Sequence, residues 1–134
     1  MKLFLDNNIS PSIARAMEIV VANDGHTARA LRDRFPPNIS NVDWIGKLAK
    51  EGGWVVLSDD HRIYRNPAER AAWRQSGLIG FFLASGWRKM SVREKTGRLL
   101  LVFPNLVNAA SFLHSGSIAE LPIGLHSKIK PFRL

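Results

Sequence analysis

The chain has 134 residues and a mass of 15.0 kDa, which is enough for one domain with a sizeable core. Its 46% hydrophobic and 22% charged residues are typical of a globular protein; no apolar run approaches the ~18 residues of a membrane span, and the lack of cysteine excludes disulfides and thiolate metal sites. The formal net charge of +8 favours a polyanionic partner, above all nucleic acid, although a basic surface can also serve solubility alone.

The first half of the chain alternates apolar runs with helical patterns. Residues 2–5 form an apolar run that Asp6 interrupts, which predicts a strand rather than a signal peptide. Together with the lack of cysteine, this favours the cytoplasm. The elements predicted up to residue 65 are a strand at 2–5, a helix from 11 to about 23, a short strand at 26–31, a basic loop at 32–41, a helix at 42–51, a strand at 54–58 and a polar loop at 59–65.

The second half continues the alternation. Asn66 and Ser91 each begin a capping box and predict helix starts, and Pro104 is expected to break or kink the later helix. The predicted elements are a helix at 67–76, a strand at 78–84, helical stripes at 92–103 and 106–113, an edge strand at 118–123 and a loose basic tail at 124–134. This order predicts an α/β three-layer sandwich, in which a parallel sheet of about five strands is flanked by helices.

Carboxylates follow two of the predicted strands directly. Asp6 ends the first strand, whereas Asp59 and Asp60 end the third. We expect the first and third strands to be neighbours in the sheet, so that the acids meet at its carboxyl edge, where open α/β folds bind ligands. Adjacent side chains in an extended segment point to opposite sides, so one of the pair is expected in the site, with Asp59 as first choice. The structural alternative is that these acids cap loops or pair with Arg62 or Arg65.

Asp43 is the third candidate acid, in the first turn of a helix, where the helix dipole alone would also favour it. Beside the other acids it completes a set of oxygen ligands suited to Mg²⁺ or Mn²⁺, which polarise a phosphodiester and lower the pKa of an attacking water. Without a cation, clustered carboxylates would repel one another and any phosphate. The arginines of the two flanking loops are expected either to bind phosphates or to be solvated surface charges: Arg32, Arg34, Arg62 and Arg65.

The strand ending in Asp6, the acid Asp43 at a helix start and the run Leu57-Ser58-Asp59-Asp60 together resemble the compact PIN-like domains related to VapC-type toxins. The resemblance covers most of residues 1–123 and implies a single PIN-like domain there, followed by a basic tail at 124–134. It also implies that Asp6, Asp43 and Asp59 or Asp60 bind Mg²⁺ or Mn²⁺ for RNA cleavage. In that family the middle acid is usually glutamate, whereas here it is Asp43, and a fourth acid would have to be Asp60.

The function implied by the resemblance is a metal-dependent endoribonuclease, the toxin component of a toxin–antitoxin pair. Its expected partners are RNA and a cognate antitoxin, with a homodimer as a further option and no membrane. The alternative is a catalytically decayed PIN-like module that binds nucleic acid or a protein partner. A phosphoryl-switch receiver would need a lysine near residue 123, and a haloacid-dehalogenase phosphatase a second aspartate where Asn8 stands; the sequence offers neither.

Overall fold

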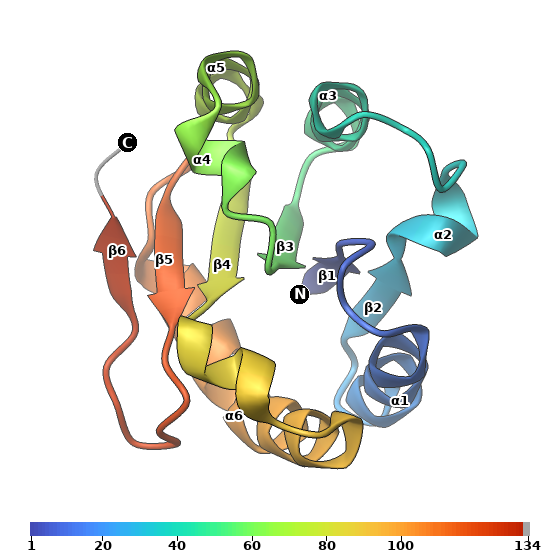
Figure 1. The fold of residues 1–134 in the computed structure, drawn as a ribbon, viewed down its shortest axis with the longest axis vertical. Coiled ribbons are helices and arrows are strands. Elements are labelled where there is room, and N and C mark those ends of the chain that lie inside the picture. Colours follow the sequence, from blue (N-terminus) through green and yellow to red (C-terminus); the bar gives the residue numbers. More distant parts are fainter. Residues whose placement is uncertain (133–134) are drawn as a thin grey trace.

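The structure, a computed structural model, describes residues 1–132 of the chain. It contains one sheet whose strands are β1 (Lys2–Leu5), β2 (Thr27–Ala30), β3 (Trp54–Ser58), β4 (Ile79–Leu83), β5 (Ile118–Leu121) and β6 (Lys130–Phe132). Across the sheet they lie in the order β2-β1-β3-β4-β5-β6 (Figure 1). The first five strands are mutually parallel, and β6 pairs antiparallel with β5.

The strand order reverses beside β1. This strand pairs with β2 on one side and β3 on the other, so that Leu5 lies opposite both Ala30 and Leu57. The first and third strands are therefore neighbours, as the sequence predicts, and the residues that follow them emerge side by side. In open parallel sheets such a reversal leaves a crevice at the carboxyl ends of the strands.

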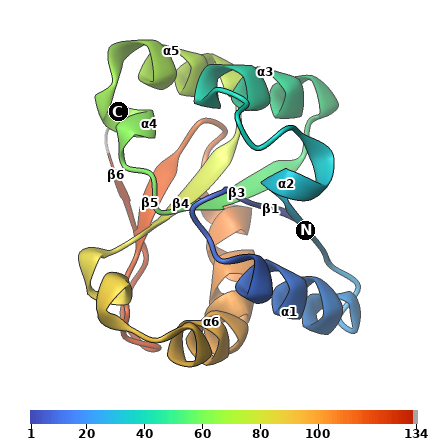
Figure 2. The ribbon, with the colours of Figure 1, turned by 45° about the vertical axis from the view of Figure 1, so that its right-hand side comes forward.

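Helices cover both faces of the sheet (Figure 2). One face carries α1 (Pro11–Ala22) and α6 (Val92–Phe112), and the other carries α2 (Leu31–Arg34), α3 (Asn41–Glu51), α4 (Arg62–Arg65) and α5 (Pro67–Ser76). A short 3₁₀ helix, η1 (Ser85–Lys89), follows β4. The predicted α/β three-layer sandwich is thus confirmed, with one strand more than expected.

Each face of the sheet has its own core because side chains alternate along a strand. Leu3 and Leu5 of β1 pack with residues of α1 and α6, whereas Phe4 between them packs with Trp44 and other residues of α3 and α5. All five residues of β3 are buried, as expected for a central strand covered on both sides. The core therefore holds β1 and β3, the two strands that carry the candidate acids, rigidly in register.

Predicted helix starts agree with the side chains that cap them. Asn66 Oδ1 accepts hydrogen bonds from the backbone N–H groups of Ala68 and Glu69, and Ser91 Oγ accepts one from Glu94. Of the break or kink predicted at Pro104, the break does not occur, because α6 continues through this residue. Pro104 lies on the exposed side of α6, where the carbonyl that loses its partner can be solvated.

Two predicted loops contain single helical turns, α2 and α4, and the predicted tail contains a strand. Residues 130–132 add β6 to the edge of the sheet, where the ring of Phe132 lies 5.5 Å from that of Tyr64. This part of the tail is therefore not a loose arm; residues 133 and 134 lie outside the described residues. Within residues 1–132, no helix has both the length and the apolarity needed to span a membrane.

Candidate functional site

The carboxyl ends of β1 and β3 open into a polar crevice of about 410 Å³. Four segments line it: the loop from β1 to α1, α2 with the loop that follows it, the start of α3 and the loop after β3. The polar residues that they contribute are Asp6, Asn7, Asn8, Asn41, Asp59, Asp60 and Arg62. The crevice lies beside β1, where the strand order reverses and where the carboxyl ends of β1 and β3 come together.

Asp6 is the most deeply buried of these acids, with 5% of its surface exposed. Its Oδ2 accepts a hydrogen bond from Ser58 Oγ at 2.7 Å, and its Oδ1 accepts one from the backbone N–H of Asn7 at 2.6 Å. Burial raises the pKa of Asp6, and the charge of Asp60 raises it further, while the two hydrogen bonds oppose the shift. No basic side chain of residues 1–132 lies within ion-pair distance of this carboxylate.

Asp60 is the second acid of the crevice, and Ser58 links it to Asp6. The backbone N–H of Asp60 donates to Ser58 Oγ at 2.9 Å, while the same hydroxyl donates to Asp6. The guanidinium of Arg62 binds both carboxylate oxygens of Asp60, with Nε–Oδ1 at 2.9 Å and Nη2–Oδ2 at 2.8 Å. These hydrogen bonds hold the pKa of Asp60 at about 2, against the effect of burial.

Asn41, the first residue of α3, bridges two carboxylates. Its Nδ2 donates to Asp60 Oδ2 at 3.0 Å and also to Glu69 at the start of α5. Its Oδ1 accepts a hydrogen bond from the buried indole N–H of Trp44 at 2.9 Å, which fixes the amide in this orientation. Asn41 was not among the site residues expected from the sequence, because an amide at a helix start gives no signal of its own.

The structure does not bring Asp43 into the crevice. Its side chain is exposed, and its backbone N–H is capped by Ser40 Oγ at 3.1 Å. Successive helical residues are rotated by about 100°, so Asp43 points roughly opposite to Asn41, two positions earlier. The residue of α3 that reaches the other acids is therefore an amide rather than the expected carboxylate.

Asp59 lines the crevice but turns toward the other side of the loop. Its carboxylate lies 3.4 Å from His61 Nε2 and 3.4 Å from Arg88 Nε, and its buried Oδ1 has no hydrogen-bond partner within residues 1–132. His61 also contacts the hydroxyl of Tyr64 and the carbonyl of Leu83. The acid of this pair that lies close to Asp6 is therefore Asp60, the second choice from sequence.

The four candidate arginines lie in different surroundings. Arg62 is at the crevice, and Arg65 is exposed with its guanidinium 5.5 Å from the centre of the Tyr64 ring. Arg34 pairs with Glu51 at 2.6 Å and stacks on Trp54, so its charge is largely used within the fold. Arg32 lines a small hollow beside the crevice.

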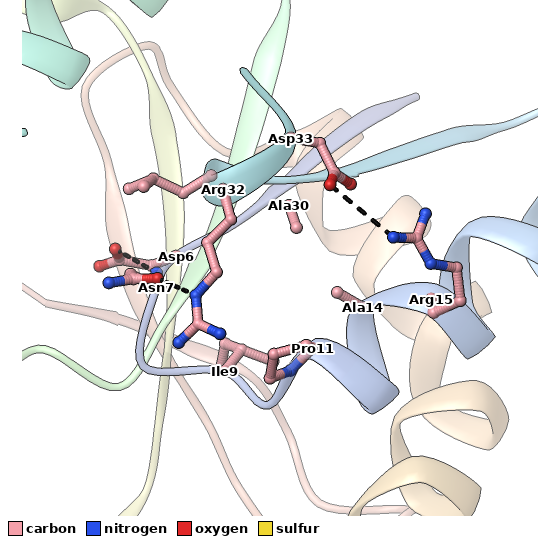
Figure 3. A pocket seen from close by; sticks show the side chains of 10 residues that line it. Asp6, Asn7, Ile9, Pro11, Ala14, Arg15, Ala30, Arg32 and Asp33 are labelled. Carbon is pink, nitrogen blue, oxygen red and sulfur yellow. Dashed lines mark hydrogen bonds and ion pairs between the residues drawn. The ribbon is translucent and has the colours of Figure 1, made fainter. Parts of the chain in front are cut away.

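A small hollow of about 80 Å³ adjoins the crevice on the side of α1 and α2. Figure 3 shows Arg32 reaching down to the Oδ1 of Asn7, beside Asp6, while Arg15 pairs with Asp33 farther along. Arg32 thus places a positive charge near Asp6 without touching its carboxylate. Both Asp6 and Asn7 line this hollow as well as the crevice.

The donor groups of the crevice fit a hard divalent cation held by two carboxylates. Magnesium commonly binds one or two protein carboxylates and fills its remaining positions with water and substrate oxygens. Asp6 and Asp60 would supply such oxygens from adjacent strand ends, and no basic side chain among the described residues forms an ion pair with Asp6. Within residues 1–132 no group of three or more His, Cys, Asp or Glu side chains is arranged to hold a metal ion. The fit is therefore to a cation with few protein ligands.

Comparison with known families agrees with this architecture. A family model described as a PIN like domain matches residues 1–85, which contain β1 to β4 and every residue that lines the crevice. No curated protein and no solved structure matches the chain. PIN domains are generally nucleases that use divalent metals and bind nucleic acids. Because the match spans more than half of its 134 residues, the chain belongs to the PIN-like domain family and has a nuclease-type fold.

Proposed function

We propose that the protein is a metal-dependent endoribonuclease that hydrolyses RNA phosphodiester bonds at the crevice between β1 and β3. The observation that carries this proposal is the pair Asp6 and Asp60. Asp6 is buried, and no basic side chain of residues 1–132 lies within ion-pair distance of its carboxylate. The carboxylate of Asp60 acts on it at the reversal point of a nuclease-type sheet. A buried carboxylate whose charge is disfavoured, as that of Asp6 is, is suited to binding a positive ion.

Asp6 and Asp60 would hold Mg²⁺ or Mn²⁺, which when bound would polarise the phosphate and lower the pKa of an attacking water. The residues around these two acids would orient the metal-binding oxygens and supply positive charge for the RNA. Ser58 and the backbone of Asn7 fix the carboxylate of Asp6, so its oxygens are already oriented. Arg62, at the rim, is placed to bind a phosphate of the RNA backbone. The net charge of +8 would attract RNA to this face and others alike.

The experiment that tests this proposal measures cleavage of a mixed-sequence RNA with Mg²⁺ or Mn²⁺. We expect Asp6→Asn and Asp60→Asn to lower the cleavage rate by about a hundred-fold or more, since each removes one negative ligand. Asp43→Asn is the matched control, because it makes the same chemical change on an exposed carboxylate outside the crevice. Cleavage that persists in Asp6→Asn or after chelation with EDTA would refute a metal-dependent site here.

We further propose that this ribonuclease is the toxin component of a toxin–antitoxin pair and acts in the cytoplasm. The support is its resemblance to compact PIN-like domains related to VapC-type toxins, together with a crevice small enough for one inserted segment of an antitoxin to cover. A homodimer is a second expected assembly, which light scattering would detect. Induced expression in a bacterial host should arrest growth, whereas expression of Asp6→Asn should not. Growth arrest by both proteins would contradict a toxic nuclease activity.

One observation favours a second candidate, a PIN-like module that binds nucleic acid or a partner without cleaving it. Arg62 and Asn41 already satisfy both oxygens of Asp60, and the start of α3 offers an amide where a third acid was expected. The same cleavage assay separates the two. RNA binding at low micromolar concentration without cleavage, in either metal, would favour the binding module.

A further inference from the structure

The guanidinium of Arg62 binds the carboxylate oxygens of Asp60 that a metal ion would need. Oδ1 of Asp60 accepts hydrogen bonds from the backbone N–H of Arg62 at 3.1 Å and from its Nε, and Oδ2 accepts from Nη2 and from Asn41. A carboxylate oxygen has about two good acceptor positions, so both oxygens are fully used. A cation can therefore bind Asp60 only if the guanidinium leaves at least one of these oxygens.

The side chain of Arg62 is free to leave. It is 77% exposed, and its guanidinium donates to no other described residue of the chain. Arg62 also lies between two hollows, since it lines both the crevice and a second cavity of about 410 Å³ at the first turns of α3 and α5. A guanidinium that swings off Asp60 therefore stays at the rim, where an RNA strand leaving the crevice would pass.

Electrostatic repulsion by a bound divalent ion would drive the guanidinium of Arg62 away from Asp60. The guanidinium of Arg62 binds Asp60 and shares the crevice with Asp6 and the second cavity with Glu69, so that a single positive charge faces three carboxylates. A divalent ion beside Asp6 and Asp60 would offset the same charges and would repel the guanidinium at close range. Released, Arg62 is a bidentate donor matched to phosphate oxygens.

We propose that Arg62 and a divalent cation compete for Asp60, so that metal binding transfers Arg62 to a phosphate of the RNA and the two ligands bind cooperatively. This inference rests on the proposed function, because it assumes that the crevice takes a metal and RNA. It adds that the free protein keeps Asp60 paired with its own Arg62, and that this arginine becomes part of the RNA contact only when the metal is present.

The first test measures Mn²⁺ affinity by isothermal titration calorimetry in the absence of RNA. Arg62→Ala removes the competing cation and should bind Mn²⁺ about five-fold more tightly than the wild type. Arg65→Ala is the matched control, because it removes the same charge from an exposed arginine three residues away that forms no ion pair with an acid of residues 1–132. Equal Mn²⁺ affinities in the wild type and Arg62→Ala, or equal gains in both variants, would overturn the proposal.

The second test measures the coupling itself with a short fluorescent RNA oligonucleotide, whose binding is read before cleavage sets in and whose integrity is verified by gel electrophoresis. Fluorescence anisotropy should show that Mn²⁺ tightens RNA binding by the wild type several-fold, and that Arg62→Ala loses most of this gain. A gain that survives intact in Arg62→Ala would refute the transfer of Arg62 to phosphate.

These binding measurements are separate from the proposed activity. If the wild type cleaves RNA but Arg62→Ala shows unchanged metal affinity, only the competition is wrong. If Mn²⁺ binding and RNA binding depend on Arg62 as predicted but no RNA is cleaved, the competition for Asp60 is supported and the nuclease function is refuted. If neither protein binds Mn²⁺, both are overturned. Thermal melts of each variant, with the exposed Arg65→Ala as reference, verify that the fold is retained.

Discussion

At the scale of single residues, Asp6 carries a charge in an environment that disfavours it. Burial raises its pKa, so the folded protein holds the Asp6 proton more tightly than the unfolded chain does. The sign follows from linkage: the contribution of Asp6 to the free energy of unfolding is largest at low pH and falls as the pH rises from 3.8 through the folded-state pKa. At neutral pH the ionised Asp6 therefore destabilises the fold.

We expect Asp6→Asn to raise the free energy of unfolding at pH 7 by on the order of 1 kcal/mol, because the amide keeps the shape of the side chain without its charge. The advantage should shrink at pH 3.5, where the wild-type carboxyl is largely protonated in both states. Urea denaturation at the two pH values checks this. A variant that is less stable than the wild type at pH 7 would show that the carboxylate is a net stabilising group.

Two residue-level expectations could not be settled from the sequence. In an extended chain the side chains of Asp59 and Asp60 point to opposite sides, but the sequence does not determine which one faces Asp6. The helical turn α4 determines it, because it folds Arg62 back onto Asp60. At the start of α3, the choice between Asn41 and Asp43 depends on the rotation of the helix, which the packing of Trp44 fixes. Both depend on contacts between distant segments.

At the scale of elements, the strands, the helix caps and the adjacency of β1 and β3 were predictable because they depend on local patterns and on the topology of parallel sheets. The pairing of residues 130–132 with β5 was not, because a three-residue strand of exposed residues has no pattern of its own. The continuity of α6 was also missed, since only its orientation on the sheet places Pro104 toward solvent.

The packing of α5 on β4 gives a test at this scale. A Cβ added at Gly80 would lie 2.6 Å from one ring carbon of Trp73, the buried residue of α5 that faces β4. Gly80→Ala should therefore lower the free energy of unfolding by about 1–3 kcal/mol through overpacking.

Gly97→Ala is its matched control, because Gly97 lies within α6 and has nothing within 4 Å of its added Cβ. There, alanine should stabilise the protein by about 0.5–1 kcal/mol through its helix propensity. Chemical denaturation compares the two variants. A Gly80→Ala protein as stable as Gly97→Ala would mean that α5 does not pack on β4 as described.

At the scale of the whole molecule, the net charge of +8 makes RNA binding a salt-dependent process. We expect Arg65→Ala to weaken RNA binding and to lower the slope of log affinity against log salt by about 0.7 if Arg65 contacts one phosphate of a single strand. Arg34→Ala is the contrasting variant, since Arg34 is paired with Glu51 and stacked on Trp54. An unchanged slope in Arg65→Ala would assign that arginine to another role.

The central claim is that Asp6 and Asp60 form the metal site of a nuclease, and the position of a bound Mn²⁺ tests it most directly. We predict that crystals soaked in Mn²⁺ show one anomalous peak bonded to carboxylate oxygens of Asp6 and Asp60, with the guanidinium of Arg62 displaced from Asp60. The same soak of Asp6→Asn crystals should show no peak there. A peak at Asp43 or Asp59 instead, or none at the crevice in the wild type, would contradict the account.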